Sequence, residues 1–309
     1  MRYLFTNVLG SFVIDENIHL VDSILFSDTE QYLAPEKTET TLIRKHLHLD
    51  PLPKHLLPHA LLLFKEKHFL PEFKKRNLLL TKNALKQSVS EDILIMQAIS
   101  SILELDKMTN ILSKRLREWY GWYFPELSEQ CSSHEKFVEL IITKSREELQ
   151  NDISQNETMG ADLSPVHVEE MRQLALQVHA LYQLRRHHEI YLEQTMKQYC
   201  PNLLELAGTT IAAQLIELGK GLKHLALLPS STIQLLGAEK ALFRHLKTGS
   251  RSPKHGIIIN HPLVQNAKWK EKGKMARSLA DKLSLCARLD YFKGEFKAPE
   301  YRQALEKKL

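Results

Sequence analysis

The sequence predicts a mainly α protein with a small α/β domain at its N-terminus, a long helical coiled-coil hairpin, and an all-α domain at its C-terminus. Strand-forming residues gather in the first part of the chain. From Glu91 onward, apolar residues recur every three or four positions, as on one face of a helix. Glycines punctuate the helical segments of the last hundred residues. We therefore expect three domains, over residues 1–90, 91–202 and 203–309.

The N-terminal domain is expected to begin with short strands. Tyr3–Leu9 and Ser11–Ile14 are rich in strand formers, and Gly10 between them is predicted at a bend or bulge. Another short apolar run, His19–Phe26, follows a turn. Glu36–His48 is expected to form a helix, so this part of the chain combines strands with helices.

The middle of the chain predicts long helices. One amphipathic helix is expected from Glu91 to about Trp119, and Gly121 and Pro125 follow it as helix-ending residues. A second helix is predicted from His134 to about Gln150. The polar segment that follows is expected to turn the chain back on itself.

A coiled-coil seam is predicted after Ser164 and Pro165, which are typical of an N-cap and a first helical residue. The seam positions are spaced alternately by three and four residues: Met171, Leu174, Val178, Leu181, Arg185, His188, Leu192, Thr195 and Tyr199. Polar residues within such a seam usually specify register or pairing at some cost in stability. An antiparallel hairpin of two long helices, docked on a partner, is the expected arrangement.

Positive charge is concentrated near the C-terminus. Residues 237–309 contain 17 Lys and Arg against 7 Asp and Glu, whereas residues 1–236 contain 25 against 30. Such a block favours a polyanionic partner, phosphate backbones above all. A solvated basic surface without a partner is equally compatible with charge alone.

The sequence contains no strong signal for a membrane segment, a cofactor or a metal. No apolar stretch approaches the roughly 18 residues that a membrane helix needs, and the first residues lack signal-peptide features. Three widely spaced cysteines, Cys131, Cys200 and Cys286, indicate a reducing interior, so a cytoplasmic location is expected. The histidines at 187 and 188 diverge by about 100° on a helix, and no nucleotide-binding or hydrolase motif occurs. We expect no metal, no cofactor and no catalysis.

The most informative segment is GAEKALFRHLKTG, residues 237–249, followed by SRSPKHG to residue 256. A short helix is predicted from Ala238 to Lys247, with Gly249 as a left-handed cap. Lys240, Arg244 and Lys247 would share one face of it, whereas the leucines at 242 and 246 would pack on another. A cationic helical face beside a basic loop is suited to the phosphates of a folded RNA. An ordinary charged surface helix is the alternative.

These strings resemble the signature of the Nop domain family. The resemblance extends to His261-Pro262, to GKMAR at 273–277, to ARLDYF at 287–292, and to shorter motifs in the first 216 residues. The compact form is similar to the archaeal members of this family.

The resemblance implies a non-catalytic core subunit of the box C/D ribonucleoprotein, which methylates ribose 2′-hydroxyls. Residues 1–90 would hold the methyltransferase fibrillarin, the coiled coil would pair with a second copy, and the Nop domain would bind a kink-turn guide RNA together with a small ribosomal-type protein. By matched position, the RNA- and protein-binding residues would be Gly237, Lys240, Phe243, Arg244, Lys247, Arg251, Lys254 and His255.

Three positions depart from the usual family pattern: Ser250, Ser252 and Gln214. They are small changes that could tune loop stiffness or a single contact. Three other functions stay open at this point. They are a splicing-type Nop protein that binds a spliceosomal RNA, an enzyme that acts directly on RNA, and a coiled-coil adaptor whose basic surface is incidental.

Overall fold

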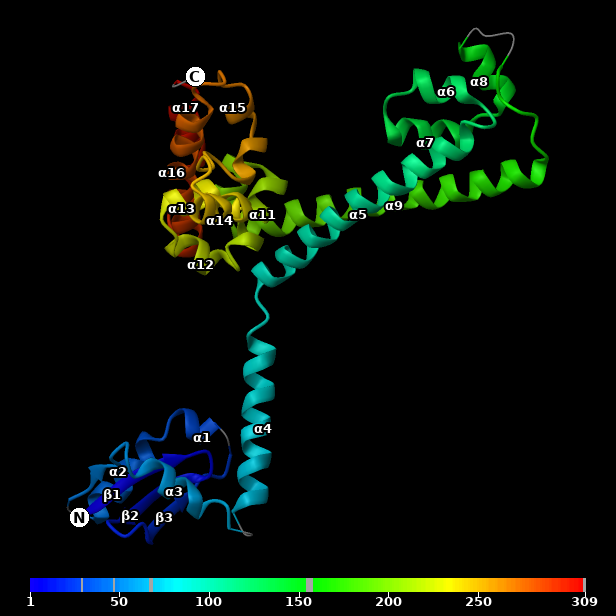
Figure 1. Cartoon of the computed structure of the whole chain (residues 1–309). Coiled ribbons are helices and arrows are strands. Elements are labelled where there is room, and N and C mark those ends of the chain that lie inside the picture. Colours follow the sequence, from blue (N-terminus) through cyan, green and yellow to red (C-terminus); the bar gives the residue numbers. More distant parts are fainter. Residues whose placement is uncertain (29, 47, 67–68, 154–157, 308–309) are drawn as a thin grey trace. The chain divides into compact units, whose positions relative to one another are not determined.

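The computed structural model describes residues 1–28, 30–46, 48–66, 69–153 and 158–307. Contacts divide the chain into two compact units, Met1–Ser90 and Glu91–Leu309. The first unit contains a small sheet and helices, and the second is helical, so the predicted fold class is confirmed (Figure 1). Within the described ranges, no helix has the length and apolar character needed to span a bilayer.

The first unit is built on a four-stranded sheet in the order β3-β2-β1-β4. The strands β1, β2 and β3 form antiparallel pairs, and β4 runs parallel to β1. Their bounds are Arg2–Asn7 for β1, Gly10–Asp15 for β2, Leu20–Leu25 for β3 and Asp50–Pro51 for β4. The helices are α1 (Glu30–Leu33), α2 (Glu36–Lys45), α3 (Leu57–Leu63) and α4 (Leu70–Gln87).

Gly10 follows the turn between β1 and β2 and pairs regularly with Asn7, so the predicted bend is present and Gly10 forms no bulge. A Cβ atom at Gly10 would lie 2.2 Å from the carbonyl oxygen of Ile24, so only glycine permits β3 to approach this closely. The register shift of the sheet lies instead between Val13 and Ile14.

The second unit contains two long helices, α5 (Glu91–Tyr120) and α9 (Pro165–Tyr199). They pack against each other in antiparallel directions (Figure 1). The hydroxyl groups of Ser113 and Tyr182 lie 3.2 Å apart, and Asp106 of α5 accepts a hydrogen bond from Arg185 of α9. The predicted antiparallel hairpin is therefore present, with its second helix starting at Pro165 as expected.

The buried face of α9 differs in part from the predicted seam. Met171, Val178 and Leu192 are buried as predicted. At two other seam positions the next residue is buried instead, Ala175 in place of Leu174 and Met196 in place of Thr195. A straight helix has 3.6 residues per turn, so its inner face drifts away from a strict alternation of three and four.

Three short helices cover one end of the hairpin: α6 (Pro125–Gln130), α7 (His134–Thr143) and α8 (Arg146–Ile153). The prediction of one helix from His134 to Gln150 is therefore wrong. Ser145 and Glu148 explain the break, because the Ser145 N–H donates to Glu148 Oε2 at 2.8 Å and the Glu148 N–H donates to Ser145 Oγ at 3.3 Å. This reciprocal capping box starts a new helix.

The C-terminal helices gather around α16 (Lys272–Tyr291), which contacts α10, α12, α13 and α17. Their shared core also takes in residues of α5 and α9. The other elements are α10 (Pro201–Ala207), α11 (Thr209–Leu218), α12 (Leu222–Leu227), α13 (Ser230–Leu235), α14 (Glu239–Thr248), η1 (Ile257–Asn260), α15 (Pro262–Gln265) and α17 (Ala298–Glu306).

Buried Asp290 joins three of these helices. Its carboxylate accepts hydrogen bonds from the backbone N–H groups of Asn202 (3.0 Å) and Leu203 (2.8 Å), at the start of α10, and from Asn202 Nδ2 at 2.9 Å. Asn202 Oδ1 in turn accepts from the N–H groups of Lys297 and Ala298, at the start of α17. Burial raises the pKa of Asp290, and the N–H donors oppose that rise.

Candidate nucleic-acid interface

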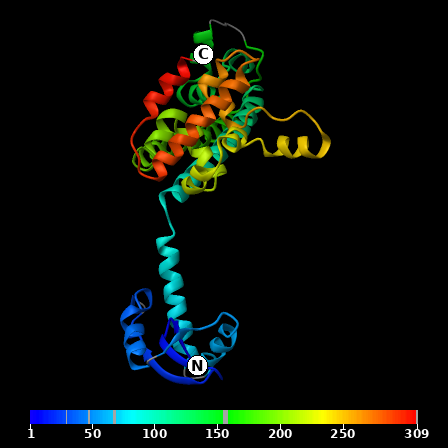
Figure 2. The ribbon, with the colours of Figure 1, turned by 90° about the vertical axis from the view of Figure 1, so that its left-hand side faces the viewer.

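Residues 237–255 form an arm that projects from the C-terminal helices (Figure 2). Helix α14, the central part of this arm, has no buried residue. Since burial of an apolar face normally holds a helix in place, α14 depends on the backbone at its two ends for its position.

The base of the arm is a backbone clamp. The N–H of Gly256 donates to the carbonyl of Gln234, and the N–H of Ile257 donates to that of Leu236, each at 2.8 Å. The side-chain amide of Gln234 adds a third bond, since its Nε2 donates to the carbonyl of Lys254 at 2.6 Å. A Cβ atom at Gly256 would lie 1.8 Å from the Leu236 carbonyl oxygen, so the clamp closes only over glycine.

The substitution Gly256→Ala is expected to open this clamp and lower the free energy of unfolding by about 2–3 kcal/mol, as overpacking against rigid backbone does. Gly249→Ala is the control, because a Cβ atom at Gly249 would meet no other atom within 4 Å, although φ there is +67°. Gly249→Ala should lower the free energy of unfolding by only about 1–2 kcal/mol, the cost of placing a non-glycine residue in the left-handed conformation. Urea unfolding followed by circular dichroism compares them, and an equal cost for both would contradict the clamp.

The tip of the arm begins at Gly249, which caps α14 in the left-handed conformation as predicted. Its N–H donates to the carbonyl of His245 at 2.9 Å. His245 Nδ1 is hydrogen-bonded to the carbonyl of Ser250, which folds the chain back along the helix. The Oγ of Ser250 is buried and makes no hydrogen bond among the described residues.

One face of the arm is cationic. Lys240, Arg244 and Lys247 are exposed on consecutive turns of α14, and Arg251 and Lys254 are exposed in the loop that follows. Over the ranges that the structure describes, none of these five side chains takes part in an ion pair. Their charges are therefore not neutralised within the described chain and can meet phosphate groups.

A second face of the arm is apolar. Phe243 and Leu246 are 60% and 69% exposed, although both are large hydrophobic side chains. Leu242 is half-buried, so the expectation that Leu242 and Leu246 both pack inside is wrong for Leu246. Adjacent apolar and cationic surfaces suit a partner that presents both protein and phosphate.

Two predicted site residues, Gly237 and His255, lie at the base of the arm. Gly237 has a φ of +84°, and a Cβ atom there would lie 2.4 Å from Ile257 Cγ2. Glycine therefore allows the chain to leave the core here, close to Ile257. His255 is half-buried beside Gly256. The structure thus gathers all eight predicted residues on one arm, four of them on α14.

Among the described residues, no three His, Cys, Asp or Glu side chains are grouped so that they could hold a metal ion. The arm offers ammonium, guanidinium and apolar groups, which bind anions and nonpolar surfaces rather than cations.

Residues 101–309 match the family model described as "Nop: snoRNA binding domain, fibrillarin". The chain belongs to the Nop family. The arm lies inside the matched residues, so the predicted family signature and the projecting segment are the same part of the molecule.

Relatives of this Nop protein include a NOP5 family protein of Methanocaldococcus jannaschii, which is 41% identical over 247 residues, 74% of this chain and 59% of that protein. Nucleolar protein 56 of Schizosaccharomyces pombe is 36% identical over 65% of this chain and 45% of its own. Nucleolar protein 58 of Neurospora crassa is 37% identical over 68% of this chain and 38% of its own length. The chain spans about half the length of these relatives.

Among solved structures, a fibrillarin/Nop5p complex contains a chain that aligns with this Nop protein. The match covers 99% of each chain, with 23% sequence identity and a TM-score of 0.46.

The lysines of residues 268–274 belong to the basic block of residues 237–309, but they are not among the eight predicted site residues. A Cβ atom at Gly273 would lie 3.4 Å from Lys254 Cδ, so the arm's last lysine packs against the first turn of α16. The lysines of residues 268–274 therefore continue the basic surface beyond the arm. The sequence shows that these lysines alternate with other residue types, but this pattern does not show that they lie beside the arm.

Proposed function

We propose that this protein is a non-catalytic scaffold of a box C/D ribonucleoprotein that directs RNA 2′-O-methylation. In this role it holds a kink-turn guide RNA and the RNA's small ribosomal-type binding protein through one part of the chain. It holds the methyltransferase fibrillarin through another. Membership of the Nop family supports this role, because the family description names both snoRNA binding and fibrillarin.

The arm is the observation that carries this proposal. Its cationic face presents Lys240, Arg244 and Lys247 to phosphates, and its apolar face presents Phe243 and Leu246 to a protein. A surface with both faces on a single projecting helix is suited to a joint RNA–protein partner, because each component alone would leave one face uncovered.

The other parts of the chain complete the scaffold in this proposal. Residues 1–90 dock fibrillarin, residues 91–202 pair with a second copy, and residues 203–309 bind RNA. The coiled-coil role is supported by apolar side chains left on the outside of the hairpin: Met108 and Ile111 of α5 are 49% and 66% exposed, and Leu184 of α9 is 45% exposed. A second copy packed there would cover them.

A salt titration of RNA binding tests the joint surface. With the small protein present, the logarithm of affinity for a kink-turn RNA is expected to fall linearly with log salt. The slope should be about 2.7 to 4.5, because about three to five phosphates are neutralised and each contributes about 0.9. That slope corresponds to a loss of about 40- to 500-fold between 50 and 200 mM salt. Fluorescence anisotropy of labelled RNA measures it.

The same titration without the small protein is the control. Binding should then be weak, since the apolar face has no partner. Equal affinity for the RNA with and without the small protein would show that binding depends on positive charge alone, and this result would contradict the proposal.

A further inference from the structure

A second cationic segment lies outside the arm. Residues 268–274 read KWKEKGK, and their four lysines are accompanied by a single acidic residue, Glu271. Trp269, between Lys268 and Lys270, is 83% exposed, the most exposed of the large aromatic side chains described. No lysine of this segment forms an ion pair with any residue that the structure describes.

This segment adjoins the arm. The side chain of Lys254, at the arm's base, lies over Gly273 at the start of α16, with its Cδ 3.4 Å from the position of a Cβ atom there. Positive charge thus continues without a gap from the arm to Lys272 and Lys274. A phosphate backbone that leaves the arm at this end meets the lysine segment next.

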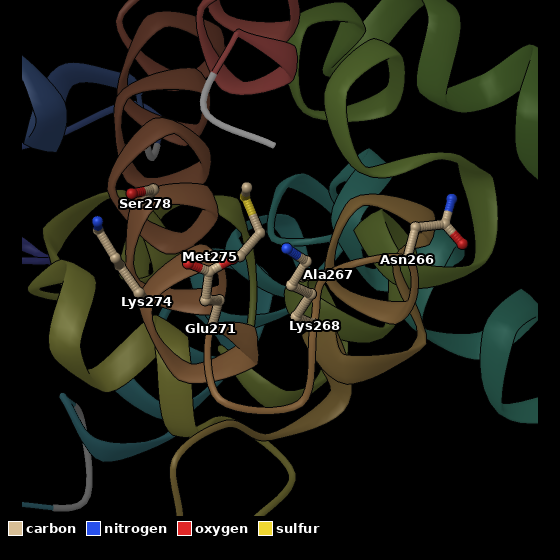
Figure 3. A pocket seen from close by; sticks show the side chains of 7 residues that line it. All are labelled: Asn266, Ala267, Lys268, Glu271, Lys274, Met275 and Ser278. Atoms are coloured by element: carbon tan, nitrogen blue, oxygen red, sulfur yellow. The ribbon is translucent and has the colours of Figure 1, made fainter.

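A hollow of about 590 Å³ opens beside the segment and is lined by Asn266, Lys268, Glu271, Lys274, Met275 and Ser278 (Figure 3). Lys274 and Ser278, one turn apart on α16, lie on one side of it, and Asn266 lies on the opposite side. Met275 is 5% exposed and gives the hollow an apolar part. The lining thus combines an apolar part with amide, hydroxyl, ammonium and carboxylate groups, and small-molecule sites typically combine an apolar wall with a few polar groups.

We propose that the lysine segment, residues 268–274, binds an unpaired stretch of RNA strand, with one base stacked on Trp269 and a neighbouring base in the hollow. Lys268 and Lys274 contact the phosphates between them. The inference rests on the proposed RNA-binding function and extends it from a folded kink-turn to the strand that leaves it.

The exposed indole decides between single-stranded and duplex RNA. Bases inside a duplex have both faces covered by their neighbours, so they cannot stack on a protein side chain. Unpaired bases have free faces, and proteins that bind them combine aromatic side chains with a positively charged track. A duplex would use the lysines but would leave Trp269 in water.

The test compares two kink-turn RNAs, each bound with the small protein: a blunt one and one that carries an unpaired uridine extension of about ten nucleotides. The wild-type chain is expected to bind the extended RNA more tightly. Trp269→Ala is expected to lower affinity for the extended RNA by about 5- to 150-fold, the effect of one lost base–aromatic stack, while binding of the blunt RNA is unchanged. Trp269→Phe should retain most of the gain in affinity that the unpaired extension gives.

Trp122→Ala is the matched control, since Trp122 is 73% exposed but belongs to the junction after α5. An undiminished gain in Trp269→Ala, or an equal loss in Trp122→Ala, would overturn the proposal. A loss for blunt and extended RNA alike would also overturn it, because Trp269 would then contact the folded RNA or the small protein. Photo-crosslinking of free 4-thiouridine-labelled oligouridine to Trp269 needs no kink-turn, so it separates failure of this inference from failure of the proposed function.

Discussion

The double substitution Arg244→Glu and Lys247→Glu is expected to lower affinity for the kink-turn RNA with its small protein by about 10²- to 10⁴-fold. Hydrogen bonds to charged groups contribute about 1.5–3 kcal/mol each, and two are lost here. Both side chains are exposed on a helix with no buried residue, so the fold should not change. Fluorescence anisotropy at fixed salt measures the affinity, and circular dichroism checks the fold.

Lys82→Glu with Lys86→Glu is the matched control. These lysines are exposed on successive turns of α4, and their reversal changes the net charge of the protein by the same amount. The control should bind nearly as well as the wild-type chain. If it lost as much affinity as the arm variant, the effect would come from overall charge and the arm would not be the contact surface.

The second large effect is expected from Asp290→Ala, which should lower the free energy of unfolding by about 3–5 kcal/mol. The substitution leaves the N–H groups of Asn202 and Leu203 and the Asn202 side-chain amide without their acceptor in a buried site. Each unsatisfied buried donor costs about 1–3 kcal/mol. The substitution Asp290→Ala also releases the side chain of Asn202, whose Oδ1 accepts hydrogen bonds from the first N–H groups of α17.

Glu205→Ala on α10 is the comparison for Asp290→Ala. Glu205 is exposed and pairs with Arg302 at 2.9 Å, a surface ion pair whose loss should cost at most about 1 kcal/mol. Urea unfolding of the whole chain, followed by circular dichroism, gives both values. Equal unfolding midpoints for the two variants would show that the Asp290 network does not hold the C-terminal helices together.

Local signals in the sequence predict much of the helical fold. Ser164 and Pro165 stand at the start of α9 as predicted, although the Ser164 side chain makes no capping hydrogen bond, and Gly249 ends α14 in the left-handed conformation. The same kind of signal at Ser145 and Glu148 divides α7 from α8, where apolar periodicity alone predicts one helix. That error is avoidable, since the capping box is readable from the sequence.

Other features cannot be predicted from local patterns. Asp290 and Asn202 are 88 residues apart, and only the packed helices bring them together. The spacing of Leu246 on α14 is that of a buried residue, but it is 69% exposed because α14 projects from the core. The contact of Lys254 with Gly273, which joins the arm to the lysine segment, likewise depends on tertiary structure.

In the proposed function, this chain physically joins a guide RNA to a methyltransferase. Biotin-labelled kink-turn RNA, loaded with its small protein, can be used to capture fibrillarin in the presence and absence of this chain. The proposal predicts capture only when the chain is present, and its loss with the Arg244→Glu and Lys247→Glu variant. Equal capture without the chain, or full capture by the arm variant, would contradict the scaffold function.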